Sequence, residues 1–176
     1  MDMSITTILI LCFFVISIIG TLLHFTHNWL KNGLLLHIFS AVNESTWEHM
    51  KLLVAPTLVV VIFQVIILKN IYANPWNGLL SLFLVEIITI PLLYEPLRIM
   101  FKEIPLLLTI LIFYLAIALG LLSEYCVLTN SVYFVSEVMA ILTLLILTIL
   151  FGIFTYFPPK WFLFKDPVSR RYGDVK

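Results

Sequence analysis

One short segment, residues 24–51, holds most of the side chains that could do chemistry. All four histidines of the chain fall inside it. The candidates in this segment are His24, His27, Asn43, Glu44, Trp47, Glu48 and His49. Imidazole and carboxylate groups can together hold a metal ion or transfer protons. Average composition does not produce such a cluster, so it is the first candidate for a polar functional site.

A metal site is one interpretation of this segment. His24 and His27 are three residues apart, which places both on one face of a helix. If His49 and an acid such as Glu44 lie close to that face, the set suits zinc or a similar metal. Such an ion beside a membrane could activate water against a lipid-like ester. The chain has no His-x-x-x-His or HExxH pattern, so zinc is a hypothesis and the sequence requires no cofactor.

A structural interpretation and a metal-free pocket remain open beside it. Ser45 and Glu48 have the spacing of a capping box, in which Ser45 caps a helix and Glu48 reaches back to the N–H of the cap. Asn43 suits the turn before that helix. Trp29 and Trp47 suit a membrane interface. Alternatively, the same polar groups line a metal-free pocket for a small ligand or a lipid headgroup.

Composition decides what kind of protein must position these residues. Hydrophobic residues make up 62% of the 176 and charged residues 11%, against about 45–50% and about 25% in soluble domains. The mean hydropathy is +1.11. A soluble domain could not cover so much apolar surface, and a disordered chain would be far more polar. Ten Lys+Arg against ten Asp+Glu leave no net positive charge for nucleic acid. The composition therefore predicts an all-α polytopic transmembrane helical bundle in contact with the lipid bilayer.

Five apolar stretches are long enough to cross, since a bilayer needs roughly 20 apolar residues per helix. We expect spans at about residues 4–23, 52–68, 78–94, 104–122 and 132–157 of a single transmembrane domain, 1–176. The apolar run 33–39 is too short to cross and predicts an interfacial or re-entrant helix between the first two spans. A sixth span through residues 29–42 is the alternative.

Five crossings divide the ten basic residues nine to one. Only Lys69 shares a side with the N-terminus, while the other side takes Lys31, Lys51, Arg98, Lys102, Lys160, Lys165, Arg170, Arg171 and Lys176. The positive-inside rule then predicts a cell-membrane protein with its N-terminus outside and its C-terminus in the cytoplasm. The first stretch lacks a basic leader and is expected to remain as an anchor. The short basic tail, residues 160–176, is expected to rest on the anionic inner leaflet.

Four polar side chains fall within the predicted spans: Gln64, Glu86, Glu124 and Glu137. Glu86 lies near the middle of the third span. Acids inside a membrane cost a few kcal/mol and normally face the bundle interior, so these groups from four helices suggest a proton or cation site. The alternative is a neutral Glu86 hydrogen-bonded between helices, with Glu124 and Glu137 at the headgroups.

Two motifs resemble a known family. They are residues 39–53, FSAVNESTWEHMKLL, and residues 154–159, FTYFPP, the latter followed by Phe164-Lys-Asp-Pro167 and Tyr172-Gly173. Together they resemble the signatures of an uncharacterised family, a domain of unknown function, of small prokaryotic multi-pass membrane proteins. The resemblance implies a shared membrane fold but no activity. The family's proline before Val-Asn-Glu is Ala41 here, an expected acid is Gln64, and another near Thr109 is missing, so any role of those acids is not carried over.

Both motifs fall on the predicted cytoplasmic side, where they would build one site from His24, Asn43, Glu44, Trp47, Glu48, His49 and Asp166. We therefore predict an integral membrane protein of unknown activity with a cytoplasmic-facing polar site. The first alternative is a membrane-embedded hydrolase or transferase, metal-dependent or not, that acts on a lipid-like substrate. The others are a small proton- or cation-coupled transporter or binding subunit that uses Glu86, and an assembly or regulatory subunit. A homo-oligomer or a membrane partner protein suits both of these.

Overall fold

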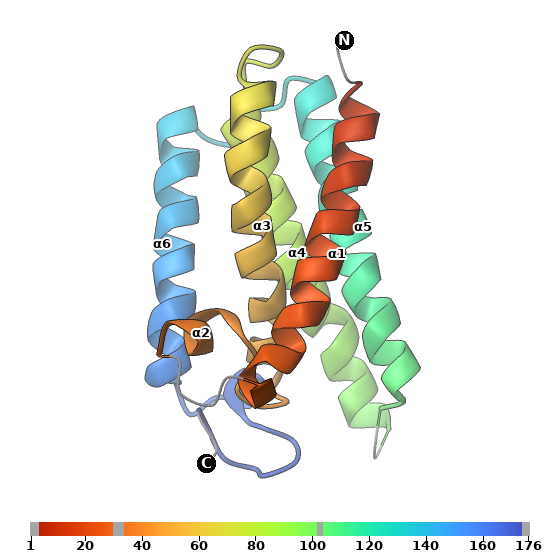
Figure 1. The fold of residues 1–176 in the computed structure, drawn as a ribbon, viewed down its shortest axis with the longest axis vertical. Helices are drawn as coiled ribbons and strands as arrows, with labels where there is room; N and C mark the ends of the chain where they lie inside the picture. The colour runs from red at the N-terminus through yellow and green to blue at the C-terminus, as the bar shows by residue number, and fades with distance from the viewer. Residues whose placement is uncertain (1–3, 30–33, 102–103, 174–176) are drawn as a thin grey trace.

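The computed structural model describes residues 4–29, 34–101 and 104–173, without the side chains of residues 27–29 and 34–36. Within these ranges the chain forms helices only (Figure 1). They are α1 (Ile5–Trp29), α2 (Leu34–Phe39), α3 (Thr46–Leu68), α4 (Pro75–Met100), α5 (Leu106–Thr129), α6 (Glu137–Tyr156) and the short 3-10 helix η1 (Phe162–Phe164). The predicted all-α class is confirmed.

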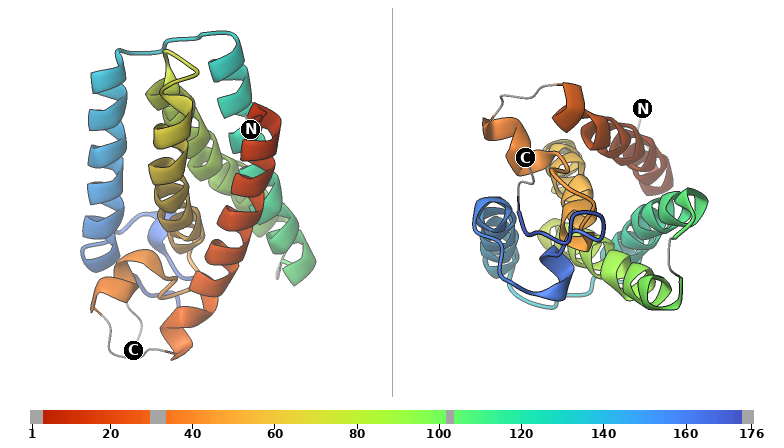
Figure 2. Two further views of the ribbon diagram at one scale, coloured as in Figure 1. Left: turned by 45° about the horizontal axis from the view of Figure 1, so that its top comes forward. Right: turned by 90° about the horizontal axis from the view of Figure 1, so that it is seen from below.

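Five helices, α1, α3, α4, α5 and α6, are long and apolar enough to cross a membrane, which confirms the predicted number of spans. α2 has six residues, roughly 9 Å of helix, and therefore cannot cross. It is the short helix predicted between the first two spans, and it packs against α6 at one end of the bundle (Figure 2). In the described part of the chain no sixth helix is long enough to span.

The long helices stand side by side, and the two ends of the bundle differ. Residues 157–173 fold across one end, which also carries α2 and the beginning of α3; we call it the tail end (Figures 1 and 2). α1 begins at the opposite end, where the α3–α4 and α5–α6 loops lie. The two family-like motifs therefore lie at the same end of the molecule.

α3 and α4 form the centre of the bundle. α4 packs against α3, α5 and α6, while α3 also packs against α1. Their buried faces supply core residues such as Leu53 and Phe83, both 0% exposed. α1, α5 and α6 expose large apolar side chains outward, for example Phe14, Leu107 and Ile149. Such a surface is stable against lipid hydrocarbon but not against water.

α3 begins at Thr46, before the uncharged stretch that starts at residue 52, because Ser45 caps it. The Ser45 hydroxyl oxygen accepts from the N–H of Glu48 at 3.4 Å, which confirms half of the predicted capping box. The other half is wrong. Glu48 Oε2 accepts from the N–H of Val42 at 3.1 Å, because the N–H of Ser45 already donates to Asn43 Oδ1 at 2.8 Å. Asn43 closes the preceding turn, as predicted.

Pro56 lies inside α3 and interrupts its hydrogen bonding. Proline has no N–H, so the carbonyl of Leu52, four residues earlier, lacks its usual helical donor. Gly20 of α1 packs directly on that carbonyl. A Cβ at Gly20 would lie 2.9 Å from Leu52 O and 2.6 Å from Phe113 Cζ. Only glycine permits this close approach of α1 to α3.

Candidate functional site

The two family-like motifs touch each other at the tail end. Asn43 Nδ2 donates to the carbonyl of Gly173 at 2.7 Å. The backbone N–H of Glu44 donates to the carboxylate of Asp166. The Glu44 side chain itself remains 51% exposed. The loop before α3 thus holds the C-terminal tail against the bundle.

Asp166 organises the tail into a fixed turn. Its carboxylate accepts from the N–H of Val168 at 3.2 Å and from the N–H and hydroxyl of Ser169 at 3.0 and 2.5 Å. Burial by itself raises the pKa of this carboxyl, but the hydrogen bonds from Ser169, Val168 and Glu44 outweigh it and hold the pKa below its ordinary value. Asp166 is therefore an ionised group whose oxygens are taken up by the turn.

Trp47 has a packing role. Its ring stacks on Phe151 of α6 at 4.2 Å and on Phe164 of η1 at 4.5 Å, and Phe154 meets it edge-on at 5.6 Å. The residue is 9% exposed. Aromatic rings packed in this way contribute burial and directional attraction. Trp47 thus joins α3, α6 and the tail, and its buried indole Nε1 has no hydrogen-bond partner among the described residues.

Glu48 forms a buried ion pair with a residue that sequence reasoning missed. Lys51 Nζ lies 2.5 Å from Glu48 Oε2, and Lys51 is 0% exposed. Lys51 also donates to the carbonyl of His37 at 2.8 Å and to the hydroxyl of Thr155 at 3.2 Å. It therefore ties α2 and α6 to α3. The i,i+3 spacing of Glu48 and Lys51 was the signal for this pair.

His49 and His24 do come together. Their rings stack with centroids 6.2 Å apart and planes inclined by 28°. The ring centroid of Tyr94 in α4 lies 5.6 Å from that of His49. His49 Nδ1 lies 3.0 Å from the carbonyl of Ser45 and Nε2 lies 3.6 Å from Glu44 Oε2. The carbonyl selects the tautomer with a proton on Nδ1, which leaves Nε2 as a proton acceptor facing Glu44.

The described residues do not assemble a metal centre: no three His, Cys, Asp or Glu side chains among them are grouped so as to hold an ion. His24, His49 and Glu44 are neighbours. His27, the third histidine of the predicted metal set, has its side chain outside the described part.

A second acid beside this cluster was also missed. Glu95 of α4 accepts from the hydroxyl of Thr46 and lies 3.2 Å from Arg98 Nη1. These contacts join the first turn of α3 to the last turns of α4. In the sequence Glu95 and Arg98 are charged residues beyond the end of the third predicted span, and nothing there indicates the contact with Thr46.

A separate polar cluster lies between the spanning helices. Glu86 of α4 is 1% exposed, and its Oε2 accepts from the hydroxyl of Thr57 at 2.6 Å. Glu124 of α5 is 0% exposed, and its Oε2 accepts from Gln64 Nε2 at 3.1 Å. In each carboxyl the other oxygen, Oε1, is buried and has no hydrogen-bond partner within the described ranges. Thr57 was missed because a threonine in an apolar helix usually bonds to its own backbone.

The antiparallel pairing of α3 and α4 sets the depth of these groups. His49 contacts Tyr94 at the tail end. Eight residues later in α3 and eight residues earlier in α4, Thr57 contacts Glu86. Eight residues correspond to roughly 12 Å of helix. The interior carboxyls are therefore remote from the imidazoles, and the two clusters are distinct sites.

Two glycines make room for the carboxyl side chains. A Cβ at Gly120 of α5 would lie 2.7 Å from Glu86 Cγ, and a Cβ at Gly78 of α4 would lie 3.4 Å from Glu124 Cγ. Each acid thus fits against a glycine of the neighbouring helix. This reciprocal arrangement allows α4 and α5 to approach closely while both carboxyls stay buried between them.

Glu137 does not join the interior cluster. Its carboxylate accepts from the N–H groups of Trp76 and Asn77 at 2.9 and 3.2 Å and from Asn77 Nδ2 at 2.5 Å. These donors belong to the first turn of α4, where the helix dipole favours an anion. Glu137 fastens the start of α6 to the start of α4, so only three of the four predicted intramembrane polar residues lie in the interior cluster.

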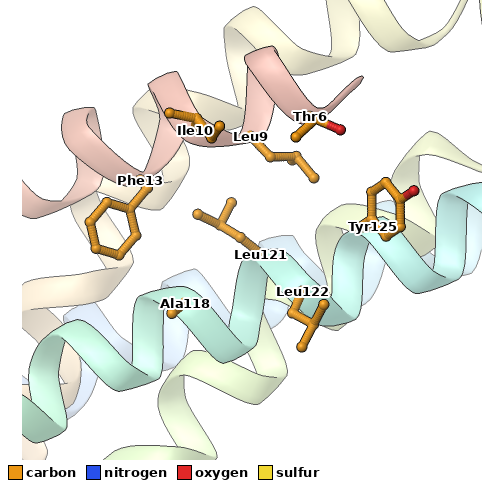
Figure 3. Close-up of a pocket in the computed structure, with 8 residues that line it drawn as sticks. All are labelled: Thr6, Leu9, Ile10, Phe13, Ala118, Leu121, Leu122 and Tyr125. Atoms are coloured by element: carbon orange, nitrogen blue, oxygen red, sulfur yellow. The ribbon is translucent and has the colours of Figure 1, made fainter. Parts of the chain in front are cut away.

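A groove lies on the outer surface between α1 and α5, in the half of the bundle nearer the opposite end. Figure 3 shows its lining side chains: Thr6, Leu9, Ile10, Phe13, Ala118, Leu121, Leu122 and Tyr125. Almost all are apolar, and neither interior carboxyl is among them. The groove is thus separate from the Glu86–Glu124 cluster.

Five spans, an apolar exterior and acids buried between helices define the class: this is a polytopic helical membrane protein. The chain belongs to the family of unknown function DUF6512, which it matches over residues 2–174. The resemblance drawn from the two motifs to an uncharacterised family is confirmed. No curated protein and no solved structure matches the chain.

Proposed function

We propose that this protein binds and exchanges protons through Glu86 and Glu124, as a small proton-coupled transporter or the proton-binding subunit of one. One observation carries the proposal. Two carboxyls on adjacent spanning helices are fully buried, each receives one hydrogen bond from a neutral donor, and each keeps one oxygen that no described residue bonds. No described basic residue pairs with either of them.

Electrostatics explains why such a pair would hold protons. An ionised carboxylate without a counter-ion costs several kcal/mol in an apolar interior, and binding a proton removes that cost. The protonated oxygen can then be the one that no neighbour occupies. The carboxyl group ionises only when water reaches it, because water can then accept the proton and solvate the carboxylate. A solely structural acid would bury its proton permanently.

The two acids lie at different depths in the bundle. Glu124 is five residues from the end of α5, roughly 8 Å, and Glu86 is eleven residues from the start of α4, roughly 16 Å. Both depths are counted from the opposite end of the bundle. Glu124 and Glu86 are thus suited to act as successive proton sites from that end to the middle of the membrane.

Deuterium exchange followed by infrared spectroscopy tests the proposal. Protein in lipid vesicles at neutral pH should show a carboxylic-acid C=O band that shifts after transfer to D2O. Glu86→Gln should remove one component, and Glu86→Gln/Glu124→Gln should remove the band. Glu137→Gln is the matched control and should leave it unchanged, because Glu137 accepts hydrogen bonds from Trp76 and Asn77 at the start of α4 and lies outside the interior cluster. A band that never exchanges would make these acids structural, and no band at all would mean that they are not protonated.

An enzyme at the tail end is the second candidate, favoured by the free Nε2 of His49 beside Glu44. His49 could act there as a general base toward a lipid-like ester. The two functions separate by variant. His49→Gln should abolish hydrolysis or transfer while sparing deuterium exchange at Glu86, and Glu86→Gln should do the reverse.

We further propose that the N-terminus lies outside the cell and the tail end in the cytoplasm, as the nine-to-one distribution of basic residues supports. The native cysteines offer a test, since Cys126 is exposed near the opposite end and Cys12 is buried. A membrane-impermeant maleimide added to intact cells should label the protein, and Cys126→Ser should prevent labelling. Labelling only after permeabilisation would reverse the orientation.

A further inference from the structure

We propose that the folded tail, residues 157–173, is a binding surface for the headgroups of anionic phospholipids. This inference concerns a different part of the molecule from the interior carboxyls and does not depend on their role. It rests on the fixed shape of the tail, on the charges that this shape leaves exposed, and on the aromatic side chains beside them.

The tail presents a defined surface. Lys165 and Tyr172 are bridged by backbone pairing, and within that loop Asp166 is bonded to Val168 and Ser169. The backbone of Asp166 also bonds to Arg170 and Arg171. Phe164 and Gly173 anchor the loop to Trp47 and Asn43. The side chains that point away from these anchors therefore keep fixed positions relative to one another.

The exposed charge of this surface is entirely positive. Lys160, Arg170 and Arg171 are exposed and Lys165 is half-buried. None of the four pairs with an acid in the described ranges. The one acid between residues 157 and 173 is Asp166, which is 5% exposed and taken up by its turn. Within residues 157–173 four positive charges thus remain with no exposed acid among them, and the exposed acid of the neighbouring loop, Glu44, is a single negative charge.

Aromatic side chains flank these charges. Phe157 is 77% exposed, Trp161 56% and Phe162 47%. The ring centroids of Trp161 and Phe162 lie 4.9 Å apart. They follow directly after α6 ends at Tyr156, at the level where a spanning helix leaves the hydrocarbon. Tryptophan and basic residues together are the side chains that favour the headgroup layer.

Position and charge together identify the partner. A phosphate in a headgroup lies where these basic residues emerge, and its acyl chains lie where the aromatic rings are exposed. The opposite end has no equivalent, since Lys69 is its one basic residue. Near an anionic leaflet each Lys or Arg contributes about fivefold in binding. The tail end should therefore enrich anionic lipid around it, and the opposite end should not.

Quenching of Trp161 fluorescence by brominated lipids tests the proposal. The protein is reconstituted in vesicles of phosphatidylglycerol and phosphatidylcholine in fixed proportion, with bromine on the chains of one lipid or the other. Subtracting the signal of Trp161→Phe isolates Trp161. We expect stronger quenching by brominated phosphatidylglycerol, and a preference that falls with added salt.

Charge variants provide the controls. Lys160→Gln, Lys165→Gln, Arg170→Gln and Arg171→Gln combined should remove the preference for phosphatidylglycerol, while Lys69→Gln should leave it unchanged. Should the combined variant fail to fold, Arg170→Gln and Arg171→Gln alone should each weaken the preference about fivefold. Equal quenching by both lipids overturns the proposal, as does a preference that survives the substitutions. Loss of the preference on adding inorganic phosphate at constant ionic strength also overturns it, because the ligand is then a free anion.

Discussion

Replacing Lys51 with methionine should lower the free energy of unfolding by about 3–5 kcal/mol. The substitution removes the buried ion pair between Lys51 and Glu48 and the bonds from Lys51 to His37 and Thr155. Methionine matches the length of the lysine stem, so the loss reports charge and hydrogen bonding rather than volume. Unfolding in mixed detergent micelles, followed by circular dichroism, measures it.

Two further variants isolate the ion pair. Glu48→Gln added to Lys51→Met should recover at least half of the lost stability, because removing both charges of a buried pair costs less than removing one of them. Lys69→Met, at an exposed lysine of the opposite end, should change stability by less than about 0.5 kcal/mol. A cost for Lys51→Met no larger than that of Lys69→Met would contradict a buried pair.

Trp47→Ala should cost about 3–5 kcal/mol as well, and should also release the tail. The substitution empties the space between Phe151, Phe154 and Phe164, and Phe164 is the main apolar anchor of the tail. Limited trypsin digestion should then cut faster after Lys165 and Arg171 than in the native protein, because the loop is no longer held against α3. Thermal unfolding and mass spectrometry of the fragments give the two readouts.

A matched aromatic distinguishes this effect from a general loss of tryptophan. Trp161→Ala removes a ring of the same size that is 56% exposed, so it should cost far less and leave trypsin resistance intact. Trp47→Phe should keep part of the stacking and fall between the two. Unchanged digestion in Trp47→Ala would mean that Asn43 and Asp166 hold the tail by themselves.

The number of spans, the short helix between the first two and the Ser45 cap could be predicted because each depends on residues close in sequence. Length and apolarity decide whether a helix can cross a membrane, and Ser45 bonds to a residue three positions away. The partner of Glu48 could not be predicted in the same way. Val42 and Lys51 both bond to that carboxylate, whereas the N–H of Ser45 bonds to Asn43, and only the folded loop before α3 shows this choice of partners.

The candidate site could be predicted only as a set of residue types. Glu86 and Glu124 were identified because an acid in an apolar span is costly wherever it points. Thr57 became visible only with the pairing of α3 and α4, since nothing in its own sequence surroundings distinguishes it from other threonines in spans. Glu137 was grouped with the interior acids because a sequence does not reveal which helix N-terminus lies beside a carboxylate.

The missing hydrogen bond at Pro56 gives α3 a built-in point of compliance. A helix bends most easily where one rung of its ladder is absent, and here the free carbonyl of Leu52 rests on Gly20 of α1. On one side of this point α3 carries the residues that hold the tail, and on the other it carries Thr57 and Gln64, the donors to the two buried acids. The two halves of α3 can therefore tilt about the contact between Leu52 and Gly20. A tilt of the half at the tail end does not require the hydrogen bonds in the middle of the membrane to break.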